Sequence, residues 1–275
     1  MRDVGLIRSG SSTPEGRTEK RWWLVSAALA TLAAWVFTVR SADSMSSTMP
    51  MPGGWSMSMA WMGMGEGAFA HAAMFLTMWT VMMVAMMLPS VLPAVLLHQR
   101  LISSRIDQGH PAAGSSALLL VGYFSVWAAF GLVAYAVGMT VSALAMRHAR
   151  VSLLIPAATG ATLIAAGVYQ LTAWKRQCLR HCRSPLDFFL RHQIRGASHS
   201  WKFGLHHGAY CAGCCWGLMA IQLALGVMSV PLMLLVAAVI LLEKQWRHGQ
   251  ALASVAGVSA IMCGVVLVLR ATIHP

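Results

Sequence analysis

The segment from Gly204 to Met219, GLHHGAYCAGCCWGLM, contains side chains that could bind a soft metal ion. On a helix, successive residues are 100° apart, and four possible ligands fall within a sector about 100° wide: His207, Cys211, Cys214 and Cys215. Thiolates are preferred ligands of Cu(I) and Zn²⁺, and imidazole suits both metals. A single buried cysteine is typical of helix packing. Three cysteines and a histidine on one face instead favour a metal site.

A second group of possible ligands precedes this segment, in the sequence KRQCLRHCRSP. Cys178 and Cys182 are four residues apart, with His181 between them. On a helix, their two sulfurs would share one face. The charge pattern described below predicts that this segment is cytoplasmic, where thiols stay reduced. Metal binding or redox chemistry is therefore favoured over a structural disulfide.

The segment from residue 40 to 67 is rich in methionine, which loops seldom are. Its methionines are Met45, Met49, Met51, Met57, Met59, Met62 and Met64, and six of them form Met-x-Met pairs. Thioether sulfur is a soft ligand that favours Cu(I), and unlike cysteine it does not form disulfides in an oxidising compartment. The pattern is consistent with a metal-collecting loop. A hydrophobic loop lying on the membrane surface is the alternative.

Methionine also recurs in the apolar segment that follows this loop. Met74, Met78, Met82 and Met86 are spaced by four residues, so they form a stripe along one side of a helix, with Met87 beside it. Methionine fills gaps between helices well, which is the simpler explanation for any one of them. The whole stripe, directly after the Met-rich loop, favours a path for a soft metal.

The composition excludes an ordinary soluble domain, a disordered chain and a nucleic-acid-binding globule. Residues of the hydrophobic class make up 57%, charged residues only 10%, and mean hydropathy is +0.64. A membrane-spanning helix needs about 20 mostly apolar residues. Seven stretches are predicted as spans: 22–39, 69–97, 117–139, 152–174, 203–225, 228–242 and 251–269. The predicted fold is therefore an all-α, polytopic transmembrane helical bundle.

The basic residues predict the orientation of the chain. With a cytoplasmic N-terminus, 16 of the 20 Lys and Arg residues fall in inner segments and 4 in outer ones. This predicts a cytoplasmic basic tail (1–21), a first span (22–39), an outer Met-rich loop (40–67) and a helical membrane domain (68–270). A cytoplasmic Cys/His loop (175–202) would belong to that domain. A cleaved signal peptide over 1–43 is the alternative, and it would leave six spans.

The depths of two spans suggest that their soft ligands could meet. Cys214 is 11 residues from the predicted cytoplasmic end of its span, about 17 Å, and Met86 lies at the same depth in the second span. The two residues would share a level near the midplane if their helices are neighbours.

The sequence does not indicate a hard-cation site, a proton relay or an enzyme. The eight acidic residues fall in predicted loops, tails or span ends, which argues against a proton relay or a hard-cation site in the membrane. The sequence contains no phosphate-binding glycine loop and no GxSxG motif, so no enzymatic activity is expected.

Several motifs together resemble one bacterial family. They are WTVMMVAMMLPS, CLRHCRSP, GLHHGAYCAGCCW and the pair Glu243-Lys244. In this combination and order they resemble the predicted metal-binding integral membrane proteins of domain-of-unknown-function family 2182. The resemblance covers about residues 65–270. It implies a metal-binding protein of the bacterial inner membrane.

These observations predict a membrane protein that binds a soft transition metal, Cu(I) first and Zn²⁺ second, in transport, delivery or homeostasis. Metal would pass from the outer loop along Met78, Met82, Met86 and Met87 to the His/Cys face, and leave near Cys178, His181 and Cys182. The expected partners are the lipid bilayer, the metal ion and a metallochaperone or acceptor protein, with no nucleic acid. A membrane thiol-redox protein and a noncatalytic helical subunit or assembly factor remain alternatives.

Overall fold

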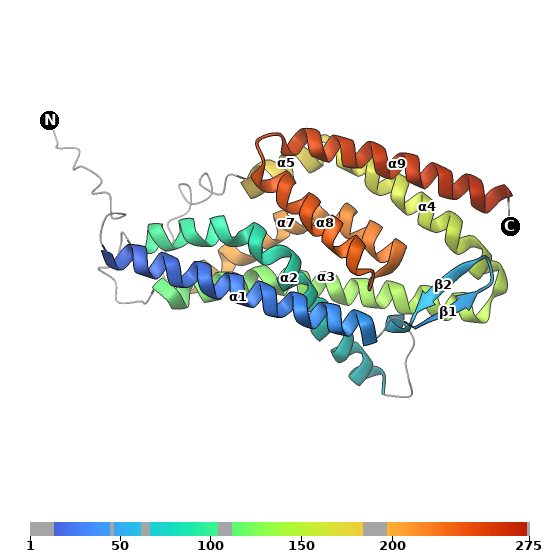
Figure 1. Ribbon diagram of the computed structural model, residues 1–275, viewed down its shortest axis with the longest axis horizontal. Helices are drawn as coiled ribbons and strands as arrows, with labels where there is room; N and C mark the ends of the chain where they lie inside the picture. Colours follow the sequence, from blue (N-terminus) through green and yellow to red (C-terminus); the bar gives the residue numbers. More distant parts are fainter. Residues whose placement is uncertain (1–13, 45–46, 62–66, 104–111, 184–196, 274–275) are drawn as a thin grey trace.

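The chain folds as a bundle of long helices (Figure 1), which confirms the predicted all-α polytopic architecture. The structure is a computed structural model that describes residues 14–44, 47–61, 67–103, 112–183 and 197–273. Its helices are α1 (Pro14–Ser44), α2 (Ala68–Ser103), α3 (Ala112–Arg147), α4 (Ala149–Leu171), α5 (Ala173–Arg183), α7 (Ala197–Gly226), α8 (Val230–Gln245) and α9 (Gly249–Ile273). Between α1 and α2 lie the strands β1 (Thr48–Met51) and β2 (Trp55–Ser58) and the 3₁₀ turn η1 (Met59–Trp61).

Six described helices are long and apolar enough to cross a membrane: α1, α2, α3, α4, α7 and α9. The predicted sixth span forms α8, which has 16 residues and is shorter than the about 20 needed for a full crossing. It nevertheless returns the chain toward the end of the bundle where α5 lies (Figure 1). As a result α1 begins and α9 ends at opposite ends of the molecule.

Helices α7 and α8 lie between the pair α2 and α3 and the pair α4 and α9 (Figure 1). The contact between α3 and α7 is close because Gly204 lies against the backbone of α3. A Cβ atom at Gly204 would overlap the carbonyl oxygen of Leu119. Glycine thus permits a helix separation that a side chain would prevent, as is common in membrane bundles. This separation brings Tyr123 of α3 beside the cysteine face of α7.

The junction between α4 and α5 shapes the segment that was predicted as a cytoplasmic Cys/His loop. Thr172 ends α4 in an extended conformation, and its hydroxyl donates to the carbonyl oxygen of Tyr169. The backbone N–H of Lys175 then donates to the same hydroxyl oxygen, at 3.2 Å. The first part of the segment 175–202 is therefore helical and packs against α7. Residues 184–196 of that segment lie outside the described part of the chain.

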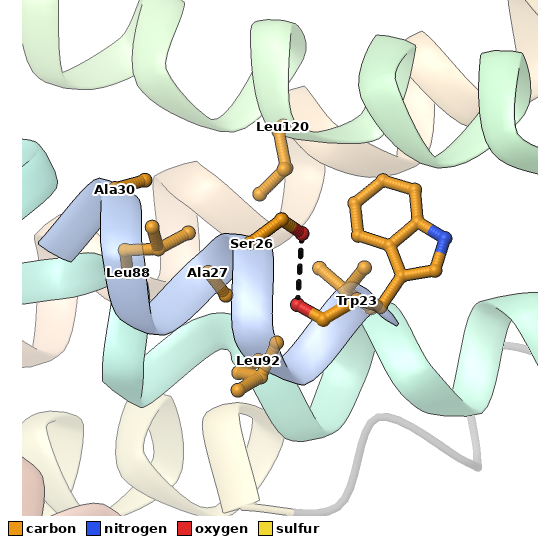
Figure 2. Close-up of a pocket in the computed structure, with 8 residues that line it drawn as sticks. Trp23, Ser26, Ala27, Ala30, Leu88, Leu92 and Leu120 are labelled. Carbon is orange, nitrogen blue, oxygen red and sulfur yellow. Dashed lines mark hydrogen bonds between the residues drawn. The ribbon is translucent and has the colours of Figure 1, made fainter. Parts of the chain in front are cut away.

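An apolar pocket of about 200 Å³ lies where α1 packs against α2 and α3 (Figure 2). It is lined by Trp23, Ser26, Ala27, Ala30, Leu88, Leu92, Val95 and Leu120. Its one hydroxyl group belongs to Ser26 and donates to the carbonyl oxygen of Trp23 at 3.1 Å. The pocket offers no soft ligand and is a gap between helices rather than a metal site.

Candidate metal centre

Three cysteines of α7 form the centre of the site. Their sulfur atoms lie within 4.8 Å of one another, and Cys214 Sγ is 3.3 Å from Cys215 Sγ. The three residues are Cys211, Cys214 and Cys215, and none is more than 1% exposed. The predicted helical spacing accounts for this grouping, since the three residues occupy one face of α7. One soft ion could be reached by all three sulfurs.

A fourth thiol comes from α5. Cys182 Sγ lies 3.6 Å from Cys214 Sγ, and the Cys182 side chain is half-buried. From the sequence, Cys182 was expected at a separate site near the cytoplasmic end, where the metal would leave. In the structure α5 folds against α7, so Cys182 adjoins the three-sulfur group. The four thiols thus form one cluster, which is called the thiol centre below.

Cys178 and His181 stand apart from the thiol centre, although they share α5 with Cys182. The Cys178 thiol is buried against α7 beside Gly213, and burial raises its pKa. His181 is exposed and stacks on Tyr210, with the ring centroids 4.4 Å apart. Neither residue belongs to the group of mutually close ligands found among the described residues.

His207 is buried, but it is not part of the three-sulfur group identified among the described residues. Its ring stacks with Phe203 and packs against Tyr123, with both centroid separations at 5.9 Å. Helical spacing predicts that His207 lies on the cysteine face, but spacing alone does not determine where the imidazole ring lies. The structure therefore separates a three-sulfur group from a neighbouring aromatic cluster.

A buried lysine contacts the thiol centre. Lys244 of α8 donates to Cys211 Sγ at 2.9 Å and to the hydroxyl oxygen of Ser90, on α2, at 3.2 Å. The hydroxyl oxygen of Tyr123 lies 2.8 Å from the same sulfur. An ammonium group in contact with a sulfur atom stabilises that sulfur as a thiolate, the form that binds metals.

Residues 76–267 match a protein family, PpoB2, which is described as a copper chaperone. The chain belongs to this copper chaperone family. The match supports the metal-binding family inferred from the motifs, although not the name domain-of-unknown-function family 2182. No curated protein and no solved structure shows a significant match. The soft sulfur ligands of the thiol centre are of the kind that copper favours.

The region matched by the copper chaperone family includes a buried ion pair beside the thiol centre. Lys175 Nζ lies 2.6 Å from a carboxylate oxygen of Glu243 and donates to the carbonyl oxygen of Cys214 at 2.5 Å. The amide of Gln170 donates to the other carboxylate oxygen at 3.1 Å. Burial lowers the pKa of Lys175 and the Glu243 carboxylate raises it, with a net upward shift. The pair fixes α5 and α8 around the backbone of Cys214.

Sequence reasoning did not assign the residues that surround the sulfurs: Ser90, Tyr123, Lys175, Glu243 and Lys244. Glu243 was expected at a span end and as part of a motif of the resemblance, yet only 1% of it is exposed. The available signal was the adjacent Glu243-Lys244 pair at the end of an apolar run. Adjacent opposite charges at such a position are unusual in the membrane and indicate a functional role.

Most of the methionine stripe also lies in the region that the copper chaperone family matches, whereas Met74 precedes that region and is 46% exposed. Met78, Met82, Met86 and Met87 are all buried, at 5% exposure or less. An amide N–H of Gln222, on α7, donates to Met82 Sδ at 3.6 Å. At the other end of the stripe, Ser90 accepts from Lys244 and donates to the carbonyl oxygen of Met87. Ser90 and Lys244 therefore connect the end of the stripe to the thiol centre through α8. The shared level of Met86 and Cys214 stays a prediction.

Proposed function

We propose that the protein holds Cu(I) as cargo in the thiol centre and delivers it to an acceptor protein. The observation that carries this proposal is the group of three buried sulfurs within 4.8 Å, with Cys182 beside it. The copper chaperone family and the membrane-length helices support a role in copper handling at a membrane. The resemblance of its motifs to a bacterial family supports the bacterial inner membrane as that membrane.

Charge balance suits a metal–thiolate complex with one negative charge. Among the described residues that contact the centre, Lys175 is neutralised by Glu243, whereas Lys244 contributes one unbalanced positive charge. Cu(I) bound by two thiolates and a neutral thiol has this charge, and so does Zn²⁺ bound by three thiolates. Because uncompensated charge is costly in a buried site, Lys244 stabilises either complex. The preference for Cu(I) therefore rests on the copper chaperone family and the soft sulfur ligands.

Cys182 gives the centre a route for release. The other three cysteines are at most 1% exposed, whereas Cys182 is half-buried at the end of α5. An acceptor thiol could replace one protein sulfur at a time, starting at Cys182. The buried residues Met78, Met82, Met86 and Met87 would lead Cu(I) to the centre from the opposite end of the bundle.

A thiol-redox function is the second candidate, because the sulfurs of Cys182 and Cys214 are only 3.6 Å apart. A disulfide between them would remove two metal ligands. Thiol trapping distinguishes the two functions. A redox protein exchanges its thiols between the reduced and the disulfide form, whereas a copper protein shields them only when copper is bound.

The experiment that tests copper binding uses the full-length protein in detergent under reducing conditions. Cu(I) is titrated against a chromophoric Cu(I) chelator, and Zn²⁺ is measured in parallel. Replacing Cys211, Cys214 and Cys215 by Ala should weaken Cu(I) binding at least a hundredfold, about 2.7 kcal/mol. The matched control is Cys263→Ala, which removes an exposed thiol on α9 and should leave binding unchanged. Full Cu(I) retention by the triple variant would refute the proposed function.

A further inference from the structure

The short hairpin between α1 and α2 has two chemically different faces. Its strands pair Thr48 with Ser58, Met49 with Met57, Pro50 with Ser56, and Met51 with Trp55. Directly paired residues point to the same side of a sheet, and successive residues point to opposite sides. One face therefore carries two serines, a threonine and a proline. The other face carries three thioethers and one indole, and is called the thioether face below.

The three thioethers are close enough to share one ion. Met49 and Met57 are directly opposite, so their Cβ atoms are about 4.5–5.5 Å apart, and the diagonal neighbours Met51 and Met57 are about 7–8 Å apart. Methionine has three flexible side-chain torsions, which allow the sulfurs to converge. The hairpin segment TMPMPGGWSMS contains no acid, histidine or cysteine. Its thioether ligands are thus uncharged and soft.

Exposure gives the thioether face an inner and an outer ligand. Met57 is 1% exposed, whereas Met49 is 41% exposed. A hairpin that served only for packing would gain little from Met49, since much of that side chain contacts no protein. For metal capture the arrangement is useful, because an ion can meet Met49 first and then be enclosed by Met57.

The hairpin is held in place before any ion binds. The indole N–H of Trp55 donates to the carbonyl oxygen of Ser152, at the start of α4, at 3.1 Å. The Ser152 hydroxyl donates to the carbonyl oxygen of Pro52 at 2.7 Å. The turn itself uses Gly53 and Gly54 with φ of +95° and +71°, which glycine adopts without strain. A preformed site avoids part of the entropic cost of ordering its ligands.

We propose that Met49, Met51 and Met57 form a second Cu(I) site, which captures the ion at the end of the bundle opposite α5 (Figure 1). Neutral thioethers select Cu(I) over Zn²⁺ and Cu²⁺, because those ions prefer harder or charged ligands. The inference rests on the proposed function in taking Cu(I) as the cargo, but the site itself uses none of the cysteines. The family match begins at residue 76 and does not include the hairpin.

The test counts the Cu(I) ions that the full-length protein binds in detergent under reducing conditions. The probe is Cu(I) alone, and the signals are bound copper and the ¹³C-methyl resonances of labelled methionines. The wild type should bind two ions, and the double variant Met49→Leu, Met51→Leu should bind one, with the tighter site unchanged. Met262→Leu, which alters an exposed methionine of α9, is the control and should bind two. The single variant Met49→Leu, at an exposed position, should weaken the second ion about tenfold even if the double variant folds poorly.

The outcomes separate this inference from the proposed function. The thioether site would be overturned if the double variant still bound two ions and copper left the hairpin methyl resonances of the wild type unchanged. That result would leave the thiol centre intact. Loss of both ions in the Cys211, Cys214 and Cys215 triple Ala variant would also overturn it, because the hairpin site should bind alone. Retention of both ions by the triple variant would instead overturn the thiol centre. Binding of Zn²⁺ by the hairpin at equal affinity would contradict the proposed selectivity.

Discussion

The ammonium nitrogen of Lys244 lies 2.9 Å from the sulfur of Cys211, and both side chains are buried. The contact joins α8 to the thiol centre of α7, and through Ser90 it also reaches α2. A buried lysine beside a soft ligand is costly unless it compensates a negative charge. The relationship therefore indicates that Cys211 functions as a thiolate.

Replacing Lys244 by Leu should weaken Cu(I) binding about ten- to a hundredfold. Leucine removes the charge and, unlike methionine, adds no sulfur ligand. Hydrogen bonds to charged groups contribute about 1.5–3 kcal/mol, which corresponds to that range. Competition with a chromophoric chelator measures the affinity. Lys202→Leu, at an exposed lysine of α7, is the control and should match the wild type. Equal affinities for both variants would show that Lys244 does not compensate the thiolate.

The helices could be predicted from the sequence because apolar length and local turn residues determine them. The turn between α7 and α8 is an example: Gly226 adopts φ of +140°, and Pro231 lies in the first turn of α8. The Met-rich loop was harder to predict. Its Gly53-Gly54 pair between alternating residues is a hairpin signal, although the flanking segments are short.

The candidate site could be predicted only in part. Helical spacing groups Cys211, Cys214 and Cys215, because neighbours on one helix face are a local property. Cys182 joins them across 32 positions of sequence, and this depends on the way α5 folds back after Thr172. Likewise Glu243 resembles a residue at a solvated span end until the tertiary fold pairs it with Lys175. Local patterns contain no information about such contacts.

Breaking the buried ion pair should destabilise the bundle. Glu243→Ala leaves the ammonium group of Lys175 buried without its carboxylate, which typically costs about 3–5 kcal/mol. The double variant Lys175→Met, Glu243→Ala should recover much of this loss, because the unpaired charge is gone. Denaturant unfolding in detergent measures the free energies of unfolding of the wild type, Glu243→Ala and the double variant. A double variant less stable than Glu243→Ala would argue against the pairing as the cause.

Adding a methyl group at Gly204 should separate α3 from α7. The new Cβ would overlap the carbonyl oxygen of Leu119, and overpacking of this kind costs about 1–3 kcal/mol. Cu(I) affinity should fall as well, because Tyr123 moves with α3. Gly217→Ala is the matched control on the same helix, since its Cβ would meet its neighbours at 3.4 Å or more, and helix propensity favours alanine. Thermal unfolding of the two variants should therefore shift in opposite directions. A Gly204→Ala variant as stable as Gly217→Ala would contradict the close helix contact.

Replacing Cys182 by Ala should slow the release of Cu(I) more than it weakens its binding. The half-buried Cys182 is the sulfur that an incoming thiol can replace first, whereas the other three remain to hold the ion. We expect transfer to a chromophoric chelator to slow about tenfold, a difference of about 1.4 kcal/mol in the barrier. Stopped-flow absorbance of the copper-loaded protein gives the rate, and equilibrium competition gives the affinity. Cys178→Ala is the control, because that thiol lies one turn earlier on α5 and outside the thiol centre, to which Cys182 belongs. Unchanged release from Cys182→Ala would mean that copper leaves by another route. Equal losses in rate and affinity for both variants would indicate a general disturbance of α5 instead.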